Sequence, residues 1–485
     1  MKNVFCRPLR HRFFLLLLLH TCGMRAAVKL PYFFSDNMVL QQQTRAAIWG
    51  GAKPGSAVRI TTSWNKKTYT TQADASGKWS TYIITTAAGG PYELTVSDGT
   101  PLVLHNVLLG EVWLCSGQSN MEMPMKGFKD QPVNNSNDAV FDAGNDAIRL
   151  YTVPRSVKLT AQDSSKQSSW KTAGAGAVAN FSAIGYYFAR LLQGHLKTPV
   201  GIVNISYGGS SAEAWMSQAA LQPFTDIRLP TTADSAKANN RTPTALYNGM
   251  LHPFAGFTIK GCIWYQGESN YDRPDQYLDL FPAMVKSWRA AFKQGDFPFY
   301  YAQIAPYNYA QLPPYNSGGK YNSAYLRDAQ RKACTKIINT GMVVLLDAGE
   351  ENSIHPANKE IAAKRFACLA LSQTYAQTGF GYTSPAFDSL KINAGIATLT
   401  FSNAPNGLSS FGRPLTLFEI AGADKNFRPA KAVIYRGTVL VSSPEVKEPV
   451  AVRYAFRDFV SGELFSTEGF PVSSFRTDEW QDSRP

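Results

Sequence analysis

A serine follows an apolar run in the segment LCSGQSNMEMPM, residues 114–125, where it could act as a nucleophile. Ser119 comes two residues after Gly117, directly behind residues typical of a buried strand. A serine hydroxyl is a poor nucleophile at neutral pH and requires a neighbouring base, usually an imidazole that a third group orients. Ser119 is therefore a candidate nucleophile if a histidine reaches it, and otherwise a serine of an ordinary turn.

Position in the chain separates the six histidines as candidates for that base. Four have simpler explanations: His11 and His20 in an N-terminal leader, His105 in a strand-like run, and His195 at the end of a helical segment. His252 and His355 each precede a proline in a loop. Proline is favoured in the first turn of a helix, so Pro356 sets His355 just before a helix, after the last predicted strand. His355 is our candidate base, with a solvated loop histidine as the alternative.

Two patterns of apolar and polar residues divide the chain into three regions. Residues 28–107 carry short alternating runs such as AVRITTSW between turn signals, and residues 386–485 return to similar runs, as in small β-sandwiches. Between them, residues 108–385 alternate nearly continuous apolar runs with segments of helical periodicity, as in a sheet covered by helices on both faces. We predict an α/β fold: a doubly wound parallel sheet flanked by N-terminal and C-terminal β-rich domains.

Small and polar residues end the apolar runs of that central region. In an open parallel sheet the ligand crevice lies outside the carboxyl ends of the strands, so these residues should gather at one edge. They are Ser116–Asn120 after EVWLC, Tyr207–Ser210 after GIVNIS, Gln266–Asn270 after GCIWY, and Asp347, Glu350 and Glu351 after GMVVLL.

The first 27 residues have the features of a secretory signal peptide. Basic residues precede the apolar stretch 13–19, and small residues follow it. The stretch is too short to span a bilayer, and no later run is long enough. We therefore expect export to the periplasm or the exterior. A lipid anchor at Cys22 is the less favoured alternative, because His20 and Thr21 are a poor approach to a lipidated cysteine.

Composition excludes several classes of partner. The formal charge is +13, but five basic residues lie in the leader, and no dense basic block interleaved with aromatics follows it, so nucleic-acid binding is unsupported. None of the four later cysteines forms a CxxC pair, and those within apolar runs, Cys115 and Cys262, are expected to be buried free thiols. We expect no metal and no other cofactor. Composition does not indicate an oligomeric state.

Three motifs together give the chain a specific resemblance. GQSNM at 117–121, WYQGESN at 264–270 and IHPANK at 354–359 closely resemble the sialate O-acetylesterase group of the SGNH (GDSL-type) hydrolases, which is related to some acetylxylan esterases. The likeness extends to FSDNMVLQQ near the start and PVAVRYAF near the end. Met121 stands where the GxSxG elbow of α/β-hydrolases has its second glycine, so that fold is not indicated.

The resemblance implies an acyl-enzyme mechanism. Ser119 would attack an acetyl carbonyl, and His355 would act first as base and then as acid. The oxyanion would be held by the backbone N–H of Ser119, a backbone N–H of the Gly208-Gly209 turn, and a side-chain donor for which Gln266 is our choice. Losing one such donor typically lowers the rate about a hundred- to a thousandfold.

The chain departs from the family at the third member of the triad. The family usually has an aspartate two or three residues before the histidine, where this chain has Ser353 and Asn352. We expect Glu268 of QGESN to be the carboxylate partner of His355, because related esterases use a glutamate of that motif. The alternatives are Asn352 as a neutral orienting group, or the loop acids Glu351, Glu350 and Asp347. If Glu268 is the partner, Glu268→Gln should lose most of the activity, whereas Asn352→Ala should lose little.

The sequence thus predicts a carbohydrate O-acetylesterase. O-acetylated sialic acid is the favoured substrate because of the resemblance, and acetylated xylan or another hemicellulose is the alternative within the same chemistry. A hypothesis of a different class is a glycan-binding protein whose esterase site has decayed, suggested by the missing aspartate and the β-rich flanks. Retention of Ser119, His355 and the glycine turn argues against it.

Overall fold

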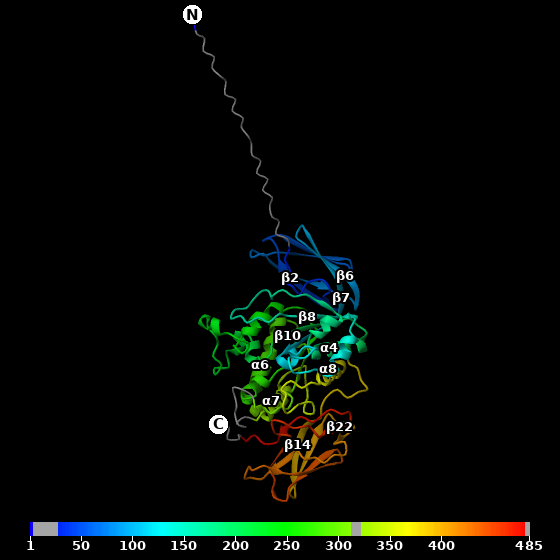
Figure 1. Cartoon of the computed structure of the whole chain (residues 1–485), viewed down its shortest axis with the longest axis vertical. Coiled ribbons are helices and arrows are strands. Elements are labelled where there is room, and N and C mark those ends of the chain that lie inside the picture. The colour runs from blue at the N-terminus through cyan, green and yellow to red at the C-terminus, as the bar shows by residue number, and fades with distance from the viewer. Residues whose placement is uncertain (3–27, 312–321, 481–485) are drawn as a thin grey trace.

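A parallel sheet crosses the middle of the molecule (Figure 1). The computed structural model describes residues 1–2, 28–311 and 322–480, so most of the predicted leader lies outside the described residues. The strands of the central path run in the order β13-β12-β11-β7-β10-β8-β9, and all pairs are parallel except β8 with β9. The bounds are β7 (Pro101–Gly117), β8 (Asn145–Thr152), β9 (Lys171–Ala173), β10 (Val200–Ser206), β11 (Gly261–Tyr265), β12 (Phe299–Ala302) and β13 (Thr340–Val343).

Helices cover both faces of this sheet, which explains why its strands are apolar on both sides. Leu114 and Trp264 point into a core that includes one pair of helices, and their neighbours Cys115 and Ile263 point into a second core with the other pair. The first pair is α6 (Pro274–Phe292) and α7 (Ala324–Ala333), and the second is α4 (Ala183–Leu196) and α8 (Lys359–Gln373). Shorter helices are α1 (Ser119–Glu122), α2 (Ser136–Phe141), α3 (Ala175–Ala179) and α5 (Gln218–Leu221). The expected α/β arrangement with additional β-sheets is confirmed.

Strand β7 joins the N-terminal β-structure to the central sheet. Its first half pairs antiparallel with β6 and its middle with β1, and its second half lies between β10 and β11. The predicted domain boundary at 107/108 therefore falls inside one continuous strand, which runs through VLLGEVWLC without a break at Gly110. The other N-terminal strands are β1 (Val39–Gln41), β2 (Arg45–Gly51), β3 (Ala57–Thr62), β4 (Lys67–Gln72), β5 (Lys78–Ile84) and β6 (Gly89–Ser97).

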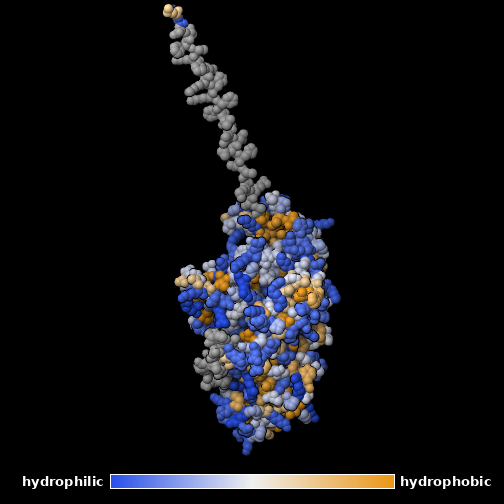
Figure 2. Space-filling view, in the orientation of Figure 1, coloured by the Kyte–Doolittle hydropathy of each residue, from blue (hydrophilic) through white to orange (hydrophobic). Residues whose placement is uncertain are grey.

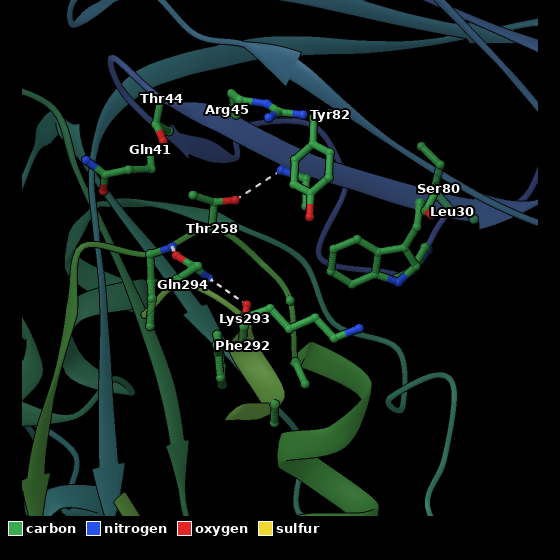
Figure 3. A pocket seen from close by; sticks show the side chains of 18 of the residues that line it. Leu30, Gln41, Thr44, Arg45, Ser80, Tyr82, Thr258, Phe292, Lys293 and Gln294 are labelled. Atoms are coloured by element: carbon green, nitrogen blue, oxygen red, sulfur yellow. Dashed lines mark hydrogen bonds between the residues drawn. The ribbon is translucent and has the colours of Figure 1, made fainter. Parts of the chain in front are cut away.

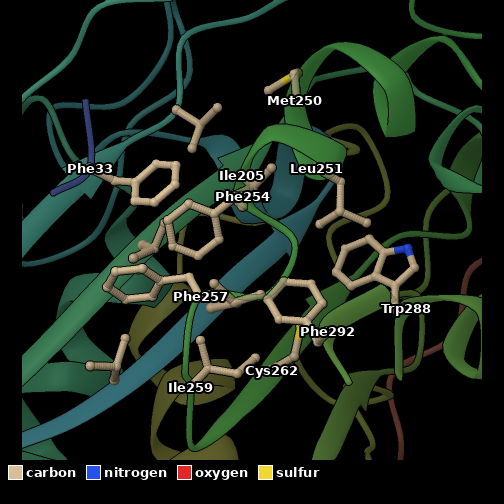
Figure 4. Packing of buried hydrophobic residues seen from close by; sticks show 14 of the residues in the cluster. Phe33, Ile205, Met250, Leu251, Phe254, Phe257, Ile259, Cys262, Trp288 and Phe292 are labelled. Carbon is tan, nitrogen blue, oxygen red and sulfur yellow. The ribbon is translucent and has the colours of Figure 1, made fainter. Parts of the chain in front are cut away.

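Aromatic packing also ties the N-terminal segment to the central region. The Phe33 ring lies edge-on to Phe254 and Phe257, with centroids 4.8 and 5.5 Å apart, and Phe254 in turn lies 6.5 Å from Phe292 of α6 (Figure 4). Next to this contact is an open cavity of about 1690 Å³, which Arg45 and Tyr82 of the N-terminal strands and Lys293 line (Figure 3). None of the candidate catalytic residues lines it, so the chemistry lies elsewhere.

The C-terminal β-structure packs against the opposite end of the central region (Figure 1). Arg327 of α7 is fully buried there and donates to the backbone oxygens of Ala455 and Asp458 and to Ser474 Oγ. The C-terminal strands are β14 (Ala386–Asn393), β15 (Ile396–Ser402), β16 (Leu408–Ser409), β17 (Phe418–Ala421), β18 (Arg428–Pro429), β19 (Lys431–Tyr435), β20 (Thr438–Ser442), β21 (Ala451–Tyr454), β22 (Phe465–Ser466) and β23 (Phe475–Arg476).

The surface seen in Figure 2 is mostly hydrophilic, with scattered small apolar areas. Across the described ranges, none of the helices combines the length and apolar character needed to cross a bilayer.

The lack of a side chain at Gly117 allows β7 to end close against β11. The φ of +137° at this glycine is unfavourable for residues with a side chain, and a Cβ there would lie 2.0 Å from the Tyr265 carbonyl oxygen. We expect Gly117→Ala to destabilise the fold well beyond the roughly 1–3 kcal/mol of backbone strain alone. Gly99, with φ +127° and open space around it, is the matched control. Thermal unfolding of the two variants measures the difference, and equal losses would contradict this account.

Candidate active site

Ser119 is the first residue of α1, directly beyond the carboxyl end of β7. The sharp change of direction is made at Gly117, so the chain passes from strand to helix within two residues. Ser119 is half-buried, and its own N–H lies in the first turn of the helix, where it has no intrahelical acceptor. The hydroxyl and a backbone donor are therefore presented together at the strand-end edge of the sheet.

His355 meets Ser119 although 236 positions separate them in the chain. It lies in the loop between β13 and α8, and its Nε2 is 2.7 Å from Ser119 Oγ. The Phe128 ring stands edge-on to the imidazole with centroids 5.4 Å apart. The structure thus brings together the two residues that sequence reasoning paired, at a distance suited to proton transfer.

Gln131 is the third group, and sequence reasoning missed it. Its Oε1 lies 2.5 Å from His355 Nδ1. An amide oxygen only accepts, so the contact requires Nδ1 to carry the proton and leaves the Nε2 lone pair directed at Ser119. Reciprocal backbone hydrogen bonds between Phe128 and Gln131, 3.0 and 3.1 Å long, fix the turn that carries the amide. No local motif marks Gln131, which lies in a polar stretch far from His355 in sequence.

Glu268 does not make the expected contact with His355. It is buried, and its Oε1 accepts a hydrogen bond of 2.5 Å from Asn120 Nδ2. That amide nitrogen also donates to the Ile354 carbonyl oxygen at 3.0 Å, and Lys359 Nζ donates to Asn120 Oδ1 at 2.5 Å. Glu268 therefore acts on the site through Asn120. Asn120 directly follows the nucleophile, and its bond to the Ile354 carbonyl ties it to the residue before the base.

The other candidate partners of His355 are also placed elsewhere. Asp347 forms a two-pronged pair with Arg365, with both oxygens 2.7 Å from the guanidinium. Glu350 Oε1 accepts from the Ala357 N–H at 2.7 Å. Glu351 and Asn352 are exposed, and neither makes a side-chain contact with the imidazole within the described residues. The loop acids therefore shape the loop rather than orient the ring.

Two of the expected oxyanion donors are engaged in other hydrogen bonds. Both Gln266 donor contacts, to Ser210 O at 3.2 Å and Asn270 Oδ1 at 2.6 Å, are inside the protein, so this side chain is a structural brace and our choice of it as a donor is not supported. Gly208 does lie beside the nucleophile: a Cβ there would be 3.3 Å from Ser119 Cβ. Its N–H, however, donates to Glu122 Oε2 at 2.7 Å. Gly209 completes the turn with φ +69°.

Burial dominates the electrostatics of the site. It lowers the pKa of His355 to about 4, and the nearby Lys359 ammonium lowers this pKa further. Burial also lowers the pKa of Lys359 to about 7, opposed by the attraction of Glu268, and raises the pKa of Glu268. The imidazole is therefore neutral at physiological pH and able to accept the serine proton.

Cys115 and Cys262 are buried free thiols, as expected. The ranges that the structure describes contain no group of three or more His, Cys, Asp or Glu side chains placed to hold a metal ion.

Comparisons with known proteins show similarity to carbohydrate esterases. A family model described as carbohydrate esterase, sialic acid-specific acetylesterase, matches residues 109–366. The sialate O-acetylesterase of Mus musculus is 29% identical over 434 residues, covering 76% of this chain and 78% of the mouse protein. The Homo sapiens protein of that name is 28% identical over 401 residues, covering 76% of each. A crystal structure of a carbohydrate acetylesterase from Xanthomonas citri has a TM-score of 0.85 and 36% identity, covering 93% of this chain and 100% of that one.

The fold and these matches define a hydrolase that acts on carboxylic esters. More particularly, the chain belongs to the carbohydrate esterase family of sialic acid-specific acetylesterases.

The Gln131 contact predicts a specific ranking of variants. Gln131→Ala should lower kcat/KM by part of the roughly hundred- to ten-thousandfold that a positioned base contributes, because the imidazole loses its orienting acceptor. Gln131→Glu should retain activity and raise the pKa of the acidic limb of the rate profile, since a carboxylate stabilises the imidazolium. Kinetics on a small acetyl ester measure both effects. Exposed Asn352→Ala is the control, and an equal loss in it would contradict the role of Gln131.

The lowered pKa of His355 predicts an unusually acidic limb. Activity requires the neutral imidazole, so kcat/KM should fall as the pH drops through about 4 rather than through the ordinary histidine value near 6.5. Lys359→Met should move the limb upward, because a positive charge that opposes imidazole protonation is removed. Lys364→Met, an exposed lysine of the same helix, should leave it in place. A wild-type limb near 6.5, or no shift in Lys359→Met, would refute this electrostatic account.

Proposed function

We propose that this protein removes O-acetyl groups from sialic acids through an acetyl-enzyme on Ser119. The observation that carries the proposal is the 2.7 Å contact between His355 Nε2 and Ser119 Oγ, in a chain of the sialic acid-specific acetylesterase family. The curated relatives are named sialate O-acetylesterases, and the chain covers more than three quarters of their length. No step of the mechanism requires a metal or another cofactor.

The reaction proceeds in two halves. His355 takes the Ser119 proton as the hydroxyl oxygen bonds to the acetyl carbonyl carbon, and the tetrahedral oxyanion forms near the Ser119 N–H and the Gly208-Gly209 turn. The C–O bond to the sugar then breaks, and the departing sugar oxygen takes the proton from the imidazolium. Water next attacks the acetyl-enzyme with His355 again as base, and acetate leaves with Ser119 regenerated.

Neighbouring residues hold this pair in position. Gln131 fixes the tautomer and plane of His355 from its Nδ1 side. Asn120 links the nucleophile helix to the histidine loop through its bonds to Glu268, Ile354 and Lys359. Glu268 and Asn120 are thus positioning residues, since neither touches the reacting atoms.

The site of action is a separate part of the proposal. The leader at residues 1–27 has the composition of a secretory signal, and we propose on that basis alone that the protein acts outside the cytoplasm.

One mixture tests the substrate and the nucleophile together. We expect that, in a solution of 9-O-acetylated sialic acid and acetylated xylo-oligosaccharides, NMR will show acetate release from the sialic acid. Ser119→Ala should lower this release at least about a thousandfold, because the attacking oxygen is removed. A serine-directed phosphonate should label the wild type at Ser119.

Other outcomes are equally informative. Selective loss of the xylan acetyl groups would move the substrate to hemicellulose while leaving the mechanism intact. No acetate release from either sugar, together with no phosphonate labelling, would contradict the esterase proposal and favour a glycan-binding role. Release that persists in Ser119→Ala would exclude Ser119 as the nucleophile.

A further inference from the structure

Three neighbouring strands bring an arginine to the edge of the site. Glu122 ends α1, which follows β7, and Tyr207 directly follows β10. Arg155 lies three residues beyond β8, the strand on the other side of β10. Because the three strands are parallel, these residues meet at the same edge as Ser119.

Hydrogen bonds to Glu122 hold one edge of the Arg155 guanidinium. Its Nε and Nη2 each lie 2.6 Å from a different oxygen of Glu122, and its plane lies over the Tyr207 ring, 4.7 Å from the centroid. The Arg155 side chain is 53% exposed, whereas that of Glu122 is 13% exposed. Among the described residues, the structure gives Nη1 no hydrogen-bond partner. A rigid guanidinium thus presents free N–H groups to solvent.

This guanidinium stands close to the reacting serine. Glu122 Oε2, which accepts from Arg155, also accepts from the Gly208 N–H, and Gly208 lies against Ser119. Gly208 and the Glu122 carboxylate therefore lie between Ser119 and the Arg155 guanidinium.

The charges around the turn favour an anionic substrate group. Glu122 neutralises one positive charge, but Lys166 Nζ donates to the Arg155 carbonyl oxygen at 2.9 Å, and exposed Arg241 donates from Nε to the Gly209 carbonyl oxygen at 3.1 Å. Arg241 thus contacts the turn directly, Arg155 reaches it through Glu122, and Lys166 lies against Arg155. Planar guanidinium groups bind carboxylates through paired N–H donors, with geometric selectivity that a lysine lacks.

We propose that Arg155 binds the carboxylate of the sialic acid substrate and thereby sets specificity for acidic over neutral sugar esters. The proposal rests on the proposed function. Sialic acid carries its carboxylate at the end of the molecule opposite its acetylated glycerol tail, so the guanidinium, separated from Ser119 by Gly208 and the Glu122 carboxylate, binds one end while Ser119 attacks the ester at the other. Glu122 and Tyr207 keep the guanidinium in the plane that its remaining N–H groups need.

Two substrates that differ only in the carboxylate provide the test. kcat/KM is measured for 9-O-acetylated sialic acid and for its methyl ester, which keeps the acetyl group but loses the negative charge. Wild type should prefer the acid roughly ten- to a hundredfold, as expected for a charge-assisted hydrogen-bonded pair. Arg155→Gln should bring the ratio close to one, mainly through KM of the acid, and Arg155→Lys should restore only part of it.

The ratio separates recognition from folding and from general catalytic damage. A smaller active fraction, or a Gly208 turn displaced by unpaired Glu122, slows both substrates equally and leaves the ratio unchanged. Arg457→Gln, which breaks a similarly exposed pair with Glu419 in the C-terminal β-structure, is the matched control and should keep the wild-type ratio.

Each other result overturns a defined part of the argument. Equal hydrolysis of both substrates by wild type would refute carboxylate recognition while leaving the esterase proposal standing. A wild-type preference that persists in Arg155→Gln but disappears in Arg241→Gln would place recognition on the other arginine and refute the assignment. No hydrolysis of either substrate would instead contradict the proposed function itself.

Discussion

The contact between His355 and Ser119 depends on a sheet that delivers both residues to one edge. β7 and β13 are not neighbours, since β11 and β12 lie between them, so the loop after β13 must reach back over the strand ends. That loop ends at Asn358, the N-cap of α8, so Pro356 lies before the helix and not in its first turn as its sequence position had suggested. The bonds of Asn120 to the Ile354 carbonyl and to Lys359 then tie the loop to the nucleophile helix. Parallel topology supplies the approach, and a buried polar network supplies the final alignment.

Burial makes the charges of this network costly unless they are paired. Glu268 and Lys359 are both nearly inaccessible, and an isolated charge in such a place is costly unless it is paired. They compensate each other through Asn120, which accepts from the lysine and donates to the glutamate. Burial is the main cause of the low pKa of His355, and the Lys359 ammonium of this network lowers that pKa further. The same interactions therefore position the base and help to keep it unprotonated.

Sequence could predict the residues whose role depends on local pattern, and it failed where the role depends on packing between distant segments. Apolar runs ending in polar residues indicated the sheet edge, and the proline after His355 indicated a helix start. The group that orients His355 could not be predicted in this way. Gln131 comes from a turn between two short helices, and no periodicity or motif connects that turn to position 355. Glu268 was misassigned for a related reason: its motif places it at the edge, but the direction of its side chain is decided by Asn120.

A neutral amide beside the histidine changes what the site must do to stabilise the transition state. A carboxylate there would favour the imidazolium that forms when Ser119 loses its proton, and Gln131 offers only a dipole. The positive charge of Lys359 opposes imidazolium formation further, while Glu268 counters that charge. Stabilisation must therefore come to a greater extent from donors to the developing oxyanion. The Gly208 N–H, which we propose as one of these donors, is held by Glu122 in the structure. In that proposal it must leave Glu122 to bind the oxyanion, which couples oxyanion binding to the carboxylate–guanidinium pair.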